Sequence, residues 1–120
     1  MRDYRKFEVW KKAHEFVTLL YPILSDYPRE ELYGITSQIR RASLSIPTNI
    51  VEGASRYSEK EFANFLNISS GSAAEVEYLL FFSLEQKFIN QIDYDMITPK
   101  LIEIRKMLNS LQNKLRKSKS

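Results

Sequence analysis

Residues 38–53 of the chain read QIRRASLSIPTNIVEG, and the spacing within this stretch indicates how the protein folds. Its apolar residues recur three or four positions apart, which is typical of the buried stripe of an amphipathic helix, and the stripe extends back to Leu32 and Ile35: Ile39, Ala42, Ile46, Ile50. The pattern predicts a helix over residues 29–52, ending at Gly53. Pro47 lies inside it and removes the hydrogen bond to the Ser43 carbonyl, so we expect a kink there.

The same helical spacing recurs in three further segments. It predicts a first helix from Phe7 to Leu24, a third from the Ser58 capping box to Lys87, and a fourth with Asp93 as its N-cap. Four amphipathic helices with short connections indicate an all-α fold, an antiparallel up-down-up-down four-helix bundle with a proline-kinked second helix. We expect residues 1–113 to form the bundle and residues 114–120 to form a basic C-terminal tail.

Composition excludes several classes of function. A chain of 120 residues with 43% apolar and 28% charged residues is typical of one small globular domain. It has no cysteine and one histidine, His14, which argues against thiolate chemistry and multi-histidine metal sites. It also has no long apolar run and no apolar signal region. We therefore expect a cytoplasmic protein with no cofactor, no metal, no membrane partner and no small-molecule substrate.

The positive charge is concentrated near the C-terminus. The chain has 18 lysine and arginine residues against 15 acidic residues, a net charge of +3, and four of the positive residues fall within the last seven positions: Lys114, Arg116, Lys117, Lys119. The remainder is close to neutral. Such a tail is either a solvated helix end or a contact for nucleic acid, with Arg40 and Arg56 as further candidate phosphate ligands.

A polar stripe flanks the isoleucines of the predicted second helix and contains Arg41, Ser45, Asn49 and Glu52. We expect this stripe, with Ser72 and Glu75 of the third helix, to form a buried hydrogen-bonded network that fixes the packing of the bundle. The alternative is a ligand or nucleic-acid surface. Because the pair Ser72 and Glu75 has no base and orienting partner, we predict that the protein is not an enzyme.

The predicted third helix is apolar around most of its circumference. Besides its core stripe it carries a second set of apolar and small residues, the candidate oligomer interface: Ile68, Gly71, Leu79, Phe82. A helix that is apolar nearly all round is buried on more than one side. In a four-helix chain of this size, that favours self-association.

Several of these segments resemble the bacterial four-helix-bundle proteins encoded by intervening sequences in 23S ribosomal RNA genes. The resemblance covers about residues 5–110 and is most specific between Arg40 and Gly53; the segments that carry it are residues 9–14, 27–34, 38–53 and 65–75. It implies the fold already predicted and a ring-like homo-oligomer, typically a pentamer. In a related branch, the accessory proteins of diversity-generating retroelements, such rings bind nucleic acid and a reverse transcriptase through basic surfaces.

The sequence thus predicts a non-enzymatic homo-oligomeric scaffold. Candidate partners are other copies of the chain, RNA or DNA, and a nucleic-acid enzyme. The near-neutral body of the chain departs from a strongly basic ring. A protein–protein adaptor with no nucleic-acid role is therefore the alternative function.

Overall fold

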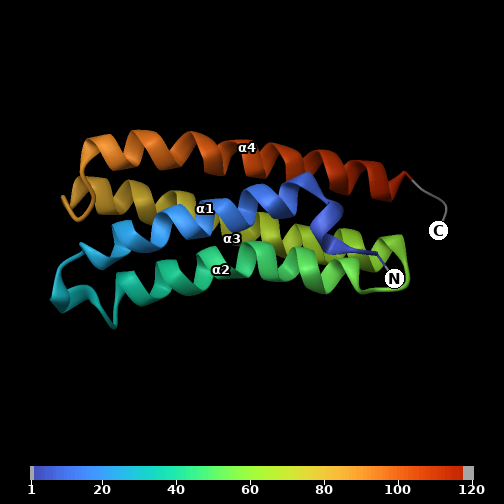
Figure 1. Ribbon diagram of the computed structural model, residues 1–120, viewed down its shortest axis with the longest axis horizontal. Coiled ribbons are helices and arrows are strands. Elements are labelled where there is room, and N and C mark those ends of the chain that lie inside the picture. The colour runs from blue at the N-terminus through green and yellow to red at the C-terminus, as the bar shows by residue number, and fades with distance from the viewer. Residues whose placement is uncertain (1, 118–120) are drawn as a thin grey trace.

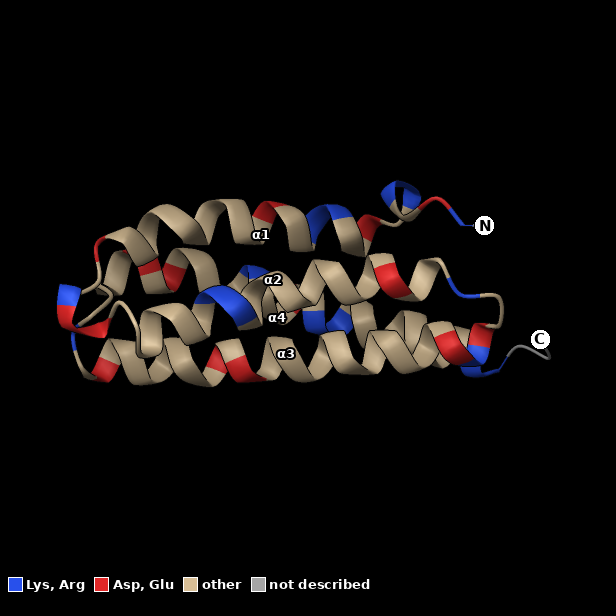
Figure 2. Cartoon of the chain, turned by 90° about the horizontal axis from the view of Figure 1, so that it is seen from below, with Lys and Arg blue, Asp and Glu red and all other residues tan. Residues whose placement is uncertain are grey.

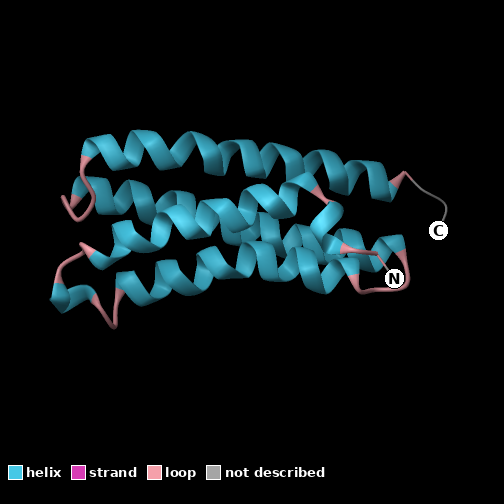
Figure 3. Ribbon diagram, in the orientation of Figure 1, coloured by secondary structure: helices cyan, strands magenta, loops and turns pink. Residues whose placement is uncertain are grey.

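The computed structural model describes residues 2–117, and within them the chain is helical and contains no strand (Figure 3). The four long helices are α1 (Glu8–Ser25), α2 (Ile35–Ala54), α3 (Glu59–Glu85) and α4 (Gln91–Arg116). Two single 3-10 turns, η1 (Tyr4–Lys6) and η2 (Arg29–Glu31), precede α1 and α2. The predicted all-α four-helix fold is confirmed. None of the helices described is long and apolar enough to span a membrane.

The four helices pack as the corners of a square. Helix α1 packs against α2 and α4, and α3 packs against the same two helices, so the α1–α2 side of the bundle is opposite the α3–α4 side. The α1–α2 and α3–α4 connections lie at one end of the 48 Å long molecule, which we call the loop end (Figure 1). The α2–α3 connection and both described chain ends lie at the other, the terminal end.

Each helix contributes one apolar stripe to a continuous core. Most residues of the predicted stripes are buried, and the largest fully buried side chains come from every helix: Phe16, Leu20, Ile39, Ile46, Ile50, Phe62, Leu66, Leu80, Ile97, Leu101, Ile104. Burying one such side chain contributes about 1.5–3 kcal/mol relative to exposure. These stripes therefore hold the bundle together.

The start of the second helix differs from the prediction. Helix α2 begins at Ile35 and not at Arg29. Gly34 has a non-helical backbone (φ −108°, ψ −117°) and so separates the turn η2 from helix α2. Leu32, predicted in the core stripe, is consequently 42% exposed. Helix α2 is then helical through Pro47 to Ala54; a kink at Pro47 stays a prediction.

The helix caps are only partly as predicted. Ser58 is confirmed as the N-cap of α3, because the Glu61 backbone N–H donates to Ser58 Oγ at 3.0 Å. The predicted cap of α4 is wrong: Asn90 caps this helix, and its side-chain oxygen accepts the backbone N–H of Asp93 at 2.8 Å. The cap thus lies three residues before the predicted position, where the backbone is still extended.

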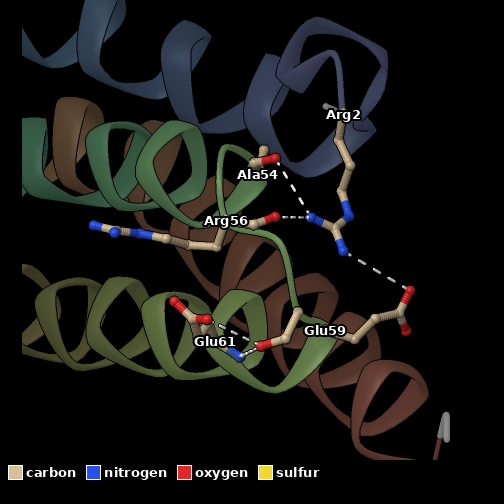
Figure 4. A network of polar contacts seen from close by, with 6 residues as sticks. Arg2, Ala54, Arg56, Glu59 and Glu61 are labelled. Carbon is tan, nitrogen blue, oxygen red and sulfur yellow. Dashed lines mark hydrogen bonds and ion pairs between the residues drawn. The ribbon is translucent and has the colours of Figure 1, made fainter. Parts of the chain in front are cut away.

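Arg2 ties the N-terminal segment to the α2–α3 connection (Figure 4). Its guanidinium donates to the carbonyl of Arg56 at 2.6 Å and to that of Ala54 at 3.5 Å, and it lies 3.9 Å from the Glu59 carboxylate. Carbonyls at a helix C-terminus have no partner inside the helix. Arg2 therefore stabilises the end of α2.

Candidate interaction surfaces

Small polar side chains form the contact between α2 and α3. The hydroxyls of Ser45 and Ser72 are hydrogen-bonded at 2.8 Å, and Asn49 Nδ2 donates to both the carbonyl and the hydroxyl of Ser45 at 2.8 Å. Deeper in the seam, the buried Ser69 hydroxyl donates to the Ile46 carbonyl at 2.8 Å. Three members of the predicted polar network, Ser45, Asn49 and Ser72, are therefore brought together, and they serve helix packing.

The other members of the predicted network lie towards solvent. Gln38 Nε2 donates to the Glu75 carboxylate at 3.2 Å on an exposed edge, and Arg41 is exposed. Glu52 was expected to be buried against a neighbouring helix, but its side chain is 51% exposed and pairs with Arg56 on its own chain segment at 3.2 Å. This expectation is wrong because Ser45 and Asn49 occupy the positions facing α3, which turns the flank with Arg41 and Glu52 outward.

The outward side of α3 carries exposed apolar residues, and Tyr78 and Phe81 continue this surface towards α4. We call it the α3–α4 face, and its exposed residues are Ile68, Gly71, Tyr78, Phe81, Phe82 and Ile102. A hollow of about 430 Å³ lies within it, lined among others by Tyr78, Phe81, Tyr94 and Ile102. The ion pair between Arg105 and Glu77 borders this hollow. An exposed apolar surface of this kind, which no other described part of the chain covers, is typical of an interaction site.

Two of the predicted interface residues, Leu79 and Gly71, differ in their burial. Leu79 was expected at the interface, but it is 8% exposed and belongs to the core cluster, because the buried arc of α3 extends further round the helix than the spacing indicated. Gly71 is exposed, and a Cβ atom added there would have no neighbour within 4 Å. The packing of a single chain therefore does not require glycine at position 71.

A second apolar concavity lies on the other side of the molecule. We call it the α1–α2 groove; it is shallow and open to solvent, and it is lined by Val17, Thr18, Tyr21, Pro22, Ser25 and Leu44. The guanidinium of Arg40 lies 5.7 Å from the centre of the Tyr21 ring, and its buried Nε–H has no acceptor among the described residues. Sequence reasoning missed this groove, although Leu44 outside the isoleucine stripe was a signal.

The remaining side, between α1 and α4, is bridged by a charged pair. Lys12 Nζ lies 3.1 Å from the Glu103 carboxylate. This hydrogen bond raises the pKa of Lys12 above its ordinary value, so the amine stays charged throughout the neutral range. Because both side chains are well exposed, the pair contributes little to stability.

The two ends of the molecule differ in charge (Figure 2). Residues 2–8, 52–61 and 114–117 at the terminal end carry eight basic and five acidic side chains, whereas residues 26–31 and 85–95 at the loop end carry two basic and six acidic ones. Lys114 and Arg116 are exposed in the last turn of α4 and Lys117 follows directly; Lys119 lies outside the described residues. The residues that were predicted to contact phosphate therefore lie in two separate parts of the molecule.

Arg56 lies at the terminal end, over the Phe65 ring at 4.6 Å, whereas Arg40 lies beside the α1–α2 groove. Arg40 is therefore separate from the basic terminal end. The residues that remain together as a candidate phosphate surface are those at the end of α4, with Arg56 at the neighbouring α2–α3 connection.

Comparison with known proteins relates these features to a family. Residues 5–110 match the 23S rRNA-intervening sequence protein family. The chain is 30% identical to a protein of unknown function from the S23 ribosomal protein family of Bacteroides thetaiotaomicron, whose crystal structure was determined at 1.70 Å; the TM-score is 0.81, and the similarity covers 88% of this chain and 95% of that one. No curated protein matches the chain. The chain belongs to the 23S rRNA-intervening sequence protein family.

Proposed function

We propose that this protein is a non-enzymatic homo-oligomeric scaffold that self-associates through its α3–α4 face. The observation that carries the proposal is Gly71, an exposed glycine in the middle of a 27-residue helix. Glycine at such a position costs about 1 kcal/mol relative to alanine. The single chain gains nothing in return, whereas a partner helix can approach the backbone closely there.

The surroundings of Gly71 support the same proposal. Ile68 is 52% exposed, Tyr78 62% and Phe82 36%, and helical spacing places all three on the same outward side of α3 as Gly71. Ser72 and Glu75, the pair that could suggest a hydrolytic site, are both engaged in hydrogen bonds to α2. Ser72 is bonded to Ser45, and Glu75 is bonded to Gln38. The α3–α4 face is therefore suited to contact with another protein chain. We assign no catalytic role to Ser72 and Glu75.

The first prediction is the mass of the particle. Sedimentation equilibrium at micromolar concentration should give a mass of several 14.2 kDa chains, with five as the stoichiometry implied by the family resemblance. A monomer of 14.2 kDa would contradict the proposal. A dimer would retain self-association and exclude a ring.

The variant Gly71→Ala tests the role of the glycine within the same experiment. In an isolated chain alanine gains about 1 kcal/mol of helix propensity. In a close-packed interface, its added methyl group separates the helices and weakens assembly. A variant that melts higher and keeps the wild-type mass would show that no partner approaches α3 closely at Gly71.

Nucleic-acid binding is the second function that we propose, and the charge difference between the two ends supports it. A closed ring would repeat the exposed Lys114, Arg116 and Lys117 around one axis. Repeated weak phosphate contacts add up to measurable affinity. The acidic loop end would repel the same ligand, so contact is expected at the terminal end alone.

The second prediction is salt-sensitive binding of RNA and duplex DNA. Fluorescence anisotropy should show affinity falling steeply between about 50 and 200 mM salt, because each neutralised phosphate releases counterions. Changing Lys114, Arg116 and Lys117 to glutamine should flatten this dependence. The matched control changes the same number of positive charges elsewhere: Lys87, Lys100, Lys106. Absence of binding at low salt would favour the adaptor function, and equal loss in both triple variants would exclude a specific basic end.

A further inference from the structure

We infer that the α2–α3 connection binds an unpaired nucleotide of a single-stranded nucleic acid. The base stacks on the ring of Tyr57, and the phosphates on its two sides contact Arg2 and Arg56. This inference rests on the nucleic-acid binding proposed above, and it names the form of nucleic acid that the terminal end selects.

The first argument is the exposure of Tyr57. This large aromatic side chain is fully exposed in the short connection between α2 and α3. The ring therefore contributes nothing to the core, and both of its faces are open. An open aromatic ring stacks on an unpaired base whatever the base sequence, because every base has a flat π-face.

The second argument is what surrounds the ring. An open hollow beside Tyr57 is lined by Arg2, Ser55 and Arg56. Tyr33 is almost as exposed, at 94%, but it lies at the acidic loop end, which repels phosphate. Exposure and positive charge therefore coincide at Tyr57 and not at Tyr33.

Both arginines are held in place by contacts that leave much of their charge available. Arg2 donates to two backbone carbonyls, which are neutral acceptors, and the Glu59 carboxylate lies 3.9 Å away, at the limit of an ion pair. Arg56 Nη2 donates to the Glu52 carboxylate at 3.2 Å, a pair whose side chains are 41% and 51% exposed. Exposed pairs of this kind are weak, so a phosphate competes readily for the guanidinium.

The placement of the two arginines matches a strand that passes over the connection. The side chain of Arg56 points away from Arg2, so the two guanidinium groups lie on different sides of the connection that carries Tyr57 (Figure 4). In a nucleic-acid strand one phosphate precedes each base and another follows it. A base on Tyr57 can therefore have each neighbouring phosphate near one arginine.

The acidic residues of this segment favour a single strand over a duplex. Glu52, Glu59 and Glu61 all lie within it, and a duplex would bring its closely spaced phosphates against them. The bases of a duplex are also paired and stacked on one another, so none is free to stack on Tyr57. A single strand supplies the free base, and its further phosphates can contact the basic end of α4 at the same end of the molecule (Figure 2).

The test compares single strands with a duplex at about 50 mM salt, where phosphate contacts are strong. Fluorescence anisotropy is measured with a short single-stranded RNA, the single-stranded DNA of the same sequence, and the duplex of that DNA. Tyr57→Ala removes the ring and Tyr57→Phe retains it. Tyr33→Ala is the matched control, since it removes an exposed ring at the loop end. Circular dichroism verifies that every variant is folded.

We expect Tyr57→Ala to weaken single-strand binding by at least about fivefold, the lower end of what one stacked base contributes. Duplex binding and the salt dependence should not change, because the ring carries no charge. Tyr57→Phe and Tyr33→Ala should bind like wild type. Arg56→Gln should instead lower the slope of log affinity against log salt by about one, as the loss of one phosphate contact does. The more tightly bound single strand identifies the sugar that the site prefers.

The results that overturn the inference differ from those that overturn the proposed function. Wild-type protein that binds no nucleic acid at low salt would refute the proposed nucleic-acid binding, and the inference with it. If wild type binds and Tyr57→Ala binds single strands equally well, the basic end of α4 accounts for the binding and the inference is wrong. Equal losses in Tyr57→Ala and Tyr57→Phe would assign the contact to the hydroxyl and exclude stacking. An unchanged salt slope in Arg56→Gln would exclude a phosphate at Arg56.

Discussion

Replacing Phe62 by alanine should cost about 3–5 kcal/mol of the free energy of unfolding, the range found for fully buried phenylalanines. Phe62 is 0% exposed and occupies the contact between α2, α3 and the N-terminal segment. The Phe7 ring meets it edge-on, with 5.4 Å between ring centres, and the Arg2 guanidinium lies 4.9 Å from its centre. Since domains of this size are stable by only about 5–15 kcal/mol, this single change should bring the fold close to unfolding.

The comparison variant for Phe62 is Tyr57→Ala. Tyr57 is a fully exposed aromatic residue in the neighbouring α2–α3 connection, so its removal should change stability by less than about 0.5 kcal/mol. Urea unfolding followed by circular dichroism gives both values at one protein concentration. A loss of less than about 1 kcal/mol for Phe62→Ala would show that this end of the bundle is loosely packed.

The helical core was predictable because burial on one face of a helix leaves a local signal in the sequence. The apolar residues assigned to the core of α2 and α4 recur three or four positions apart, and every one of them between residues 35 and 108 is buried. The Ser58 cap was predictable for the same reason, since a capping box involves residues only three positions apart. Interactions within one helix turn can be recognised without knowing the fold.

Features that depend on the position of a second helix were not predictable from spacing. Asn49 and Glu52 belong to the same polar stripe of α2, yet Asn49 is half-buried against Ser45 while Glu52 faces solvent. The two residues lie about one turn apart, and the difference in their burial depends on where α3 crosses α2. The α1–α2 groove was missed for a related reason, because Tyr21 and Leu44 are 23 residues apart and only the packed helices bring them together.

Backbone geometry accounts for the error at the start of α2. The glutamates after Pro28 are favourable in a first helical turn, so the sequence predicted a helix from Arg29. The structure uses them in the single turn η2, and Gly34 then redirects the chain before Ile35. A glycine within a helical pattern permits a break without requiring one. Spacing alone does not distinguish these two outcomes.

The second large effect is expected at Gly53, where Gly53→Ala should reduce stability by about 1–3 kcal/mol. Alanine gains about 1 kcal/mol of helix propensity over glycine, which alone would stabilise α2. However, a Cβ atom at position 53 would lie 2.8 Å from Phe62 Cδ1, 2.8 Å from Phe65 Cβ and 3.2 Å from the Phe62 carbonyl. Two of these neighbours are at or next to the backbone of α3, so relief requires the helices to separate, and overpacking of this kind outweighs the propensity.

A double-mutant cycle tests this explanation for Gly53 directly. In the Phe62→Ala background the aromatic Cδ1 is absent, so the added methyl group meets fewer atoms and Gly53→Ala should cost less than it does in wild type, by at least about 0.5 kcal/mol. Urea unfolding of the wild type, the two single variants and the double variant supplies all four free energies. Strict additivity would mean that the ring of Phe62 is not what excludes a side chain from position 53. A stabilising Gly53→Ala would mean that α2 and α3 are further apart than described, and that glycine there serves only to end the helix.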